Sequence, residues 1–231
     1  MKLSLGVITV LRHPLNSNLH LHKGSTFEGL PLMIDKGPFI LEYLVRLKDT
    51  IELALEHYPR VLAIRADLRL PRGMHLPEQV STNQVITRFF DSFKARIDYN
   101  RYKARERYPY AHGCKVRYVW TREVSREGHQ HYHLLILLNR DAFYTKGRLG
   151  SDATNMISRM EDSWSYALGI SENEVKGLVH FPENGQYRIN RIVRLGDEDQ
   201  LPELFKRASY LCKAATKSYG NRLRGFSTSK R

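Results

Sequence analysis

Cysteine is scarce in this chain of 231 residues, which has only Cys114 and Cys212. So few cysteines exclude a disulfide scaffold and any zinc finger built on cysteine ligands. No apolar run approaches the roughly 20 residues that a membrane-spanning helix needs. The opening segment has a short apolar stretch without a small-residue cleavage site, so it only weakly resembles a signal peptide. We therefore expect a protein of the reduced cytoplasm with no membrane partner.

The sequence also lacks internal repeats, low-complexity segments and the G-x-x-x-x-G-K-[ST] loop of nucleotide-driven motors. Hydrophobic residues make up 42% and charged residues 26%, which is an ordinary globular composition and excludes wholesale disorder. The length suits one domain, or two small ones, with a hydrophobic core large enough to fold without disulfides or bound metals.

Negative charge is in short supply, with 24 Asp and Glu against 37 Lys and Arg, a formal net charge of +13. This surplus favours a polyanionic partner, either nucleic acid or an anionic membrane surface. Residues 204–231 contain eight basic residues and no acidic one, and Lys94–Arg107 places Tyr99 and Tyr102 among six basic residues. Basic side chains beside aromatic ones suit phosphates and unstacked bases, although a solubilising surface has the same composition.

Periodicity predicts four helices and several strands. Helices are expected over 38–57, from Ser81 to Arg107, from Ser151 or Asp152 to 168, and from 199 to 218. Strands are expected over 60–70, 115–124 and 131–138, followed by a short hairpin of strands 175–181 and 187–193. Residues 12–37 are expected to be irregular. Hairpins make the sheet largely antiparallel, so we expect an α+β fold with helices layered on one face of the sheet.

The predicted hairpin 115–138 carries the chemistry. His131 and His133 are two apart on a strand, so both imidazoles point to one face and Tyr132 to the other. The hairpin folds Glu123, on the preceding strand, back towards them. A carboxylate beside two imidazoles makes a divalent-metal site with open positions. The plain alternative is a hairpin whose histidines are half-exposed strand residues.

The predicted last helix presents a second candidate group. At 100° per residue its apolar residues share one side, and Lys206, Tyr210, Lys213 and Lys217 share the opposite side. Nearby cations favour a phenolate and attract phosphate, so Tyr210 is placed to attack a phosphodiester. The alternative is an exposed tyrosine on a solvated basic face. Tyr219 lies about 180° round the same helix and is a poor second nucleophile.

Together these residues carry a family resemblance. Glu123, the G-x-x-H-x-H of Gly128, His131 and His133 followed by LLILL, and the Y-x-x-K of Tyr210 and Lys213 resemble the HUH endonuclease superfamily. Within it, the chain resembles the replication-initiator-type proteins of filamentous phages and related prophage proteins. The resemblance spans roughly residues 60–226.

The resemblance implies an antiparallel sheet of about five strands flanked by helices, in the HUH-endonuclease or ferredoxin-like architecture. We expect one HUH-type nuclease domain over 36–226, followed by a basic tail over 227–231. Residues 1–35 are expected as an N-terminal arm that either packs on the sheet or is mobile. The resemblance further implies Mg²⁺ or Mn²⁺ held by Glu123, His131 and His133, with Tyr210 as nucleophile. Only one tyrosine is well placed, whereas some phage initiators use two.

The implied activity is metal-dependent nicking and rejoining of single-stranded DNA through a 5′-phosphotyrosyl intermediate, in the cytoplasm of a bacterial host. Such a reaction initiates rolling-circle replication of a phage, prophage or plasmid-like element. The DNA would be an origin or a hairpin, and unwinding would need a host helicase or polymerase. Lys213 would stabilise phenolate or phosphate charge. His129 is a candidate for a group next to the metal ligands or for an alternate ligand. Asp67 is a candidate for a group that aids metal binding or, equally, for a strand-end cap. The residues expected to bind the DNA backbone are Lys94, Arg96, Arg101, Lys103, Arg105, Lys206, Lys217, Arg222 and Arg224.

Three other readings stay open on the sequence. A non-catalytic DNA-binding protein would carry the same charge and fold. A transposase or mobilisation nickase would use the same chemistry. A two-histidine, one-carboxylate iron oxygenase would have the same ligand types, but such sites suit a barrel of many short strands and leave the basic tail unexplained.

Overall fold

The computed structural model describes residues 11–73, 76–125, 128–147, 155–194, 196–215, 217 and 223–229. The helical elements are η1 (Ile34–Lys36), α1 (Leu41–His57), η2 (Glu78–Ser81), α2 (Gln84–Arg107), α3 (Met156–Leu168), α4 (Leu201–Ala208) and η3 (Ser209–Cys212). The strands are β1 (Arg12–His13), β2 (Asn16–His22), β3 (Thr26–Phe27), β4 (Leu30–Pro31), β5 (Phe39–Ile40), β6 (Arg60–Arg69), β7 (Arg117–Val124), β8 (Gln130–Asn139), β9 (Val179–His180), β10 (Gln186–Asn190) and β11 (Phe226–Thr228).

The main sheet is antiparallel and confirms the expected α+β class. Its strand order is β10-β6-β8-β7-β11, with β9 also pairing with β6. Strands β6 and β8 form its centre and pair over nine residues, from Val61 opposite Asn139 to Arg69 opposite His131. The expected hairpin is present as β7 and β8, and its register sets Glu123 opposite His131.

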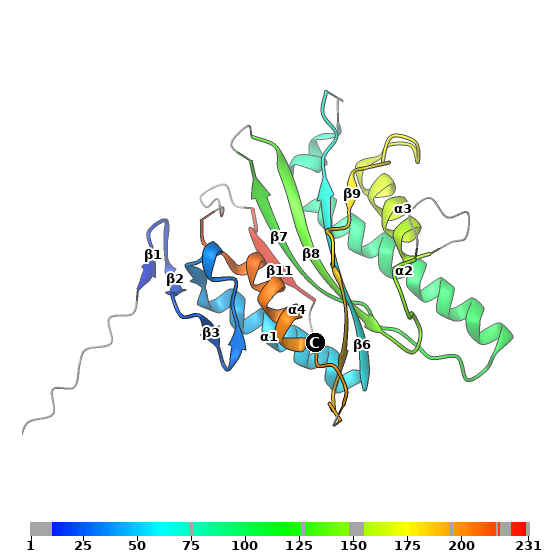
Figure 1. Ribbon diagram of the computed structural model, residues 1–231. Helices are drawn as coiled ribbons and strands as arrows, with labels where there is room; N and C mark the ends of the chain where they lie inside the picture. Colours follow the sequence, from blue (N-terminus) through cyan, green and yellow to red (C-terminus); the bar gives the residue numbers. More distant parts are fainter. Residues whose placement is uncertain are drawn as a thin grey trace, which may run out of the picture.

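Helices cover both faces of this sheet, which corrects the expectation of one covered face (Figure 1). Helices α2 and α3 pack on the face that carries Leu134 and Ile136, and helices α1 and α4 pack on the face that carries Leu135 and Leu137. The reason lies in the continuous apolar run of β8, because a strand that is apolar at every position must be buried on both sides.

Helices α1, α2 and α3 begin within a few residues of where the sequence predicts, and end where it predicts. Asn155 caps α3 through a capping box with Ser158, and Gly169 ends it in the left-handed region at φ 72°. The expected start at Ser151 or Asp152 lies outside the described residues. The expected first turn at Pro38 is wrong, because Phe39 and Ile40 form strand β5 and α1 begins at Leu41. None of the described helices is long and apolar enough to cross a lipid bilayer.

Two expected strands form, but they do not pair with each other. Strand β9 pairs with Asp67 and Leu68, and strand β10 pairs with residues 60–64, so both extend along the same edge of β6. At the other edge, strand β11 pairs with β7 and was not predicted from the sequence. Strand β11 includes Ser227 and Thr228, which were expected in the basic tail.

The chain between residues 12 and 36 has more structure than the irregular segment expected. It forms strands β1 to β4 and the short helix η1. Phe27 stacks on Phe205 of α4 with ring centroids 6.3 Å apart, and the Met33 N–H donates to Ser209 Oγ. This part of the expected N-terminal arm therefore packs against the α1 and α4 layer.

The last predicted helix ends early, which changes the surroundings of its lysines. Helix α4 ends at Ala208 and continues only as the 3-10 turn η3. Beyond it, Lys213 bridges to Phe39, and the Ala214 N–H donates to the Pro38 carbonyl, so contacts with strand β5 replace further helical bonds. The expected row of four solvent-facing side chains therefore does not form, and the chain returns towards the sheet.

Candidate metal centre

Two rows of cross-strand neighbours build the site on the sheet face that also carries α1 and α4. In the first row, Thr121, His133, Asp67 and His180 are in register on β7, β8, β6 and β9. In the second row, Glu123, His131 and Arg69 are in register. Residues directly opposite one another in an antiparallel sheet share a face. The register alone therefore brings these polar side chains together.

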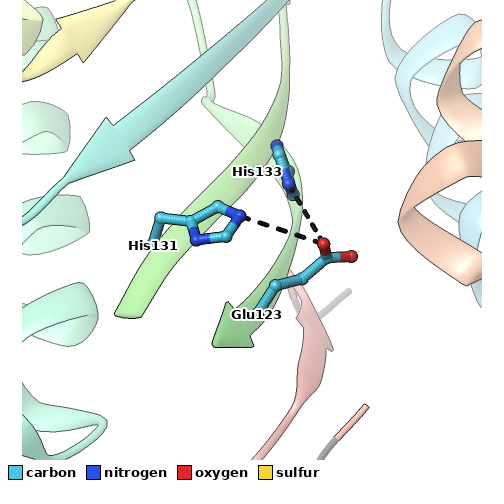
Figure 2. Close-up of side chains that lie close together, drawn as sticks. All are labelled: Glu123, His131 and His133. Carbon is cyan, nitrogen blue, oxygen red and sulfur yellow. Dashed lines mark ion pairs between the residues drawn. The ribbon is translucent and has the colours of Figure 1, made fainter. Parts of the chain in front are cut away.

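Glu123, His131 and His133 converge as predicted. One ligand atom from each lies within 4.8 Å of the others. Glu123 Oε2 is 3.4 Å from His133 Nε2 and 3.9 Å from His131 Nε2, and Figure 2 shows the carboxylate turned towards both rings. Glu123 and His133 are buried and His131 is half-buried, so one side of the group remains accessible. These three side chains, which form the metal group, can hold a metal ion.

Asp67 bonds to Nδ1 of His133, the ring nitrogen that does not face Glu123. Its Oδ1 is 2.6 Å from His133 Nδ1, and its Oδ2 is 3.6 Å from His180 Nδ1. Burial by itself raises the pKa of Asp67, but the hydrogen bond with His133 and the charge of Arg65 outweigh it, so the pKa is lowered. A carboxylate bonded to one ring nitrogen directs the other towards a ligand, as in carboxylate–histidine–metal arrangements.

The second ring nitrogen of His133 fits a bound cation. His133 Nε2 is buried and makes no hydrogen bond to the described residues. Burial lowers the pKa of His133, but the Asp67 and Glu123 carboxylates outweigh burial and raise it. The pKa of His131 is instead lowered, by burial and by the neighbouring His133. A buried ring nitrogen without a hydrogen bond, beside a second imidazole and a carboxylate, is the donor set of an open divalent-metal site.

Two lysines also contact the Glu123 carboxylate. Lys213 Nζ is 3.0 Å from Oε2, and Lys217 Nζ is 3.3 Å from Oε1 and 2.6 Å from Thr121 Oγ1. Burial lowers the pKa of Lys217 to about 8. Lys217 was expected on a solvent-facing DNA-binding surface, and its burial places it in the interior of the site instead.

Tyr210 lies beside the metal group. Its ring is edge-on to His133, with centroids 5.1 Å apart at 86°, and Lys213 Nζ lies 3.6 Å from its centroid. The Arg65 guanidinium is 5.8 Å from the same centroid. Tyr210 is therefore close to one histidine of the group and to two cations.

A pocket of about 400 Å³ opens beside the two histidines. Its lining includes Asp67, Arg69, Arg72 and His129. His129 is exposed, and it contributes to this pocket and not to the group of three ligands. The pocket gives a solvent route to the accessible side of the metal group.

The other basic residues expected to bind DNA lie apart from this site. Most are on α2, which covers the opposite face of the sheet (Figure 1). Some already have partners there, since Lys94 lies over the Tyr118 ring and Arg96 pairs with Asp162 at 3.1 Å. Their places are: Lys94, Arg96, Arg101, Lys103 and Arg105 on α2, Arg224 bonded through its backbone to Asn83 at the start of α2, Lys206 exposed on α4, and Arg222 outside the described residues.

Arg65, Thr121 and His180 also lie at the site, and they were not predicted from the sequence. Arg65 is buried on β6 and its Nε has no hydrogen-bond partner among the described residues. A charged residue inside an apolar strand pattern was the available signal for Arg65. The pairing of β9 with β6 brings in His180, and no sequence pattern indicates that pairing.

The fold and the site together define an α+β protein with a helix-flanked antiparallel sheet and a buried Glu–His–His group that can hold a metal ion. Residues 22–229 match the model of the YagK/YfjJ C-terminal domain, and the chain belongs to this family. The matched range includes the Glu–His–His group and Tyr210.

Two relatives come from Escherichia coli (strain K12). The chain is 29% identical over 198 residues to a protein described as "Uncharacterized protein YagK", a match that covers 84% of this chain and 94% of that one. It is also 29% identical over 201 residues to "Uncharacterized protein YfjJ", which covers 84% and 96% of the two chains. No solved structure gives a significant match.

Proposed function

We propose that this protein nicks single-stranded DNA and rejoins it through a covalent link to Tyr210, in a reaction that depends on a divalent metal. The observation that carries the proposal is the edge-on contact between Tyr210 and His133, because it sets a nucleophile beside the candidate metal ligands. The motif order that resembles the HUH endonucleases and the net charge of +13 support the same reading.

The proposed step is a transesterification. The Tyr210 hydroxyl oxygen attacks the scissile phosphorus, an O–P bond forms, and the bond from phosphorus to the 3′ oxygen breaks. The phenol proton is lost to solvent, and the leaving 3′ oxygen takes up a proton. The products are a 5′-phosphotyrosyl link and a free 3′-OH. Attack by that hydroxyl reverses the step, so the phosphodiester energy is conserved and no nucleotide triphosphate is needed.

The side chains around Tyr210 suit this chemistry. Mg²⁺ or Mn²⁺ bound by Glu123, His131 and His133 would polarise a non-bridging phosphate oxygen. Lys213 and Arg65 lie near the Tyr210 ring and are placed to stabilise phenolate or phosphate charge. The free 3′-OH suits priming, so we assign the protein to initiating rolling-circle replication of a phage, prophage or plasmid-like element, with a host helicase or polymerase as partner.

A covalent adduct tests the proposal. Purified protein is incubated with Mn²⁺ and a pool of labelled single-stranded and hairpin oligonucleotides, and the products are separated on a denaturing gel. We expect a labelled protein band that EDTA suppresses and that Tyr210→Phe abolishes. Tyr166→Phe is the matched control, because Tyr166 is an exposed tyrosine on α3, across the sheet.

Two outcomes contradict the proposal. One is the absence of an adduct across a broad pool, which would leave a non-catalytic DNA-binding protein as the alternative. The other is an adduct that persists undiminished in Tyr210→Phe, which would remove Tyr210 from the reaction.

A further inference from the structure

One oxygen of Glu123 faces two kinds of partner. Oε2 is 3.4 Å from His133 Nε2 and 3.9 Å from His131 Nε2, so it is the oxygen available to complete the metal group. The same Oε2 is 3.0 Å from Lys213 Nζ. A divalent ion held by the three ligands must therefore share its carboxylate oxygen with an ammonium.

We propose that Lys213 is a built-in competitor for the metal: its ammonium holds Glu123 Oε2 and is displaced when a divalent cation binds. This inference rests on the metal site of the proposed function but not on DNA cleavage. An ammonium and a divalent ion on one buried carboxylate oxygen repel each other strongly, because little water screens them. Lysine suits the competing role, since its charge is a compact point on a flexible stem.

The backbone geometry confines the exchange to the side chain. The Lys213 backbone is fixed by its bridge to Phe39, and the next residue, Ala214, donates to the Pro38 carbonyl. The ammonium also lies 3.6 Å from the Tyr210 ring centroid. When it leaves Oε2 it remains beside Tyr210, so metal binding frees a cation next to the proposed nucleophile.

Lys217 has a different place on the same carboxylate. Its ammonium has no exposed surface, bonds Thr121 Oγ1 at 2.6 Å, and faces the other oxygen, Oε1. Lys217 therefore orients Glu123 without occupying the oxygen that faces the histidines. The two lysines form a matched pair that separates competition for one oxygen from a general effect of positive charge.

Metal affinity tests the inference without DNA. Mn²⁺ is titrated into wild type, Lys213→Met and Lys217→Met, and binding is followed by calorimetry and by the electron paramagnetic resonance of free Mn²⁺. Methionine keeps most of the lysine stem and removes the charge. We expect Lys213→Met to bind Mn²⁺ about 10- to 100-fold more tightly than wild type, the range over which groups next to metal ligands change affinity. Lys217→Met should bind no more tightly than wild type.

The Mn²⁺ affinities of the three proteins decide the inference. An equal gain in both variants would show a general charge effect and overturn the inference, as would an unchanged or weaker affinity in Lys213→Met. Binding by Lys213→Met alone would support it, and no binding by any of the three proteins would overturn it.

A structural measurement on the wild type covers the case of a poorly folded variant. In crystals with Mn²⁺ bound at the three ligands, Lys213 Nζ should lie away from Glu123 Oε2, and an unmoved ammonium would overturn the inference. If the Mn²⁺ measurements give the expected results but no DNA adduct forms, only the proposed DNA cleavage is contradicted, and the competition between Lys213 and the metal still holds.

Discussion

Tyr210 and His133 meet edge to face across the junction between the sheet and the turn that follows α4. Their ring centroids are 5.1 Å apart, and their planes are at 86°. They are far apart in sequence, and the 3-10 turn η3, which continues α4, places Tyr210 beside His133 of β8. His133 thus connects three groups: Asp67 behind it, Glu123 in front, and Tyr210 on its ring.

Asp67 should control metal affinity although it is not among the three ligands. We expect Asp67→Asn to weaken Mn²⁺ binding by about 10- to 100-fold, because the amide no longer fixes the His133 ring as the carboxylate does. The measurement is a calorimetric titration without DNA. His180→Ala is the control, since His180 only approaches the other Asp67 oxygen at 3.6 Å. An unchanged Mn²⁺ affinity in Asp67→Asn would show that Asp67 supports the fold but not metal binding.

Metal binding should stabilise the folded chain. At a free Mn²⁺ concentration one hundred times the Kd, the expected gain is about 2.7 kcal/mol in the free energy of unfolding. Thermal melts with and without Mn²⁺ measure this gain, and EDTA should reverse it. Glu123→Gln should lose the increment, whereas Glu106→Gln, on the exposed face of α2, should keep it. An increment of equal size in Glu123→Gln would place the ion elsewhere.

Both sides of the central strand should matter to stability. Leu135 and Ile136 are neighbours on β8, fully buried on opposite faces of the sheet. We expect either residue changed to alanine to lower the free energy of unfolding by about 2–5 kcal/mol, because each leaves a cavity in a different core. Urea denaturation measures this, with the exposed Val124→Ala as the control. A near-neutral result at either core position would contradict the two-sided sheet.

The hairpin of the site was readable from sequence because it depends on local rules. The side-chain alternation of a strand predicts that His131 and His133 share a face, and a short connection predicts that Glu123 folds back beside them. Both expectations are met. The same run, LLILL, contained the information that the sheet is covered on both sides, since an unbroken apolar strand has no solvent face.

The rest of the site depends on contacts between distant segments, which periodicity does not encode. The residues after Ala208 have good helical periodicity, yet hydrogen bonds to Pro38 and Phe39 outweigh it. That single change turns Lys213 and Lys217 from a surface row into buried partners of Glu123. Strand β11 was missed for a related reason, because three residues carry too little pattern to predict a strand.

The two cysteines should report on the integrity of both cores. Cys114 and Cys212 are buried free thiols, and burial raises the pKa of Cys114 to about 11 and also raises that of Cys212. Because the thiolate is the reactive form, a raised pKa keeps each thiol protonated at pH 8. We expect iodoacetamide to label neither in the folded protein at pH 8 and both in urea, as counted by mass spectrometry. Rapid labelling of native Cys212 would show that its surroundings open easily.

Short single strands of DNA should contact only the pocket beside the histidines, whereas long strands should also contact α2 on the other face of the sheet. Arg69 and Arg72 line the pocket beside the histidines, whereas Lys103 and Arg105 lie on α2 across the sheet. We expect a strand of about 8 nucleotides, a length within the range that single-stranded DNA-binding folds cover, to bind at the pocket without reaching α2. In a Tyr210→Phe background, Arg69→Ala with Arg72→Ala should therefore weaken binding of short and long strands alike. Lys103→Ala with Arg105→Ala should weaken only the long ones.

Fluorescence anisotropy over a salt series measures both effects. Removing one side chain that binds a phosphate should reduce the slope of log affinity against log salt by about 0.7. If the α2 pair weakens the 8-nucleotide strand as much as the pocket pair does, the effect is one of net charge, and the pocket has no special part in holding the DNA. If neither pair changes the affinity for any strand, the positive charge serves solubility, and the basic surfaces of this protein do not bind DNA.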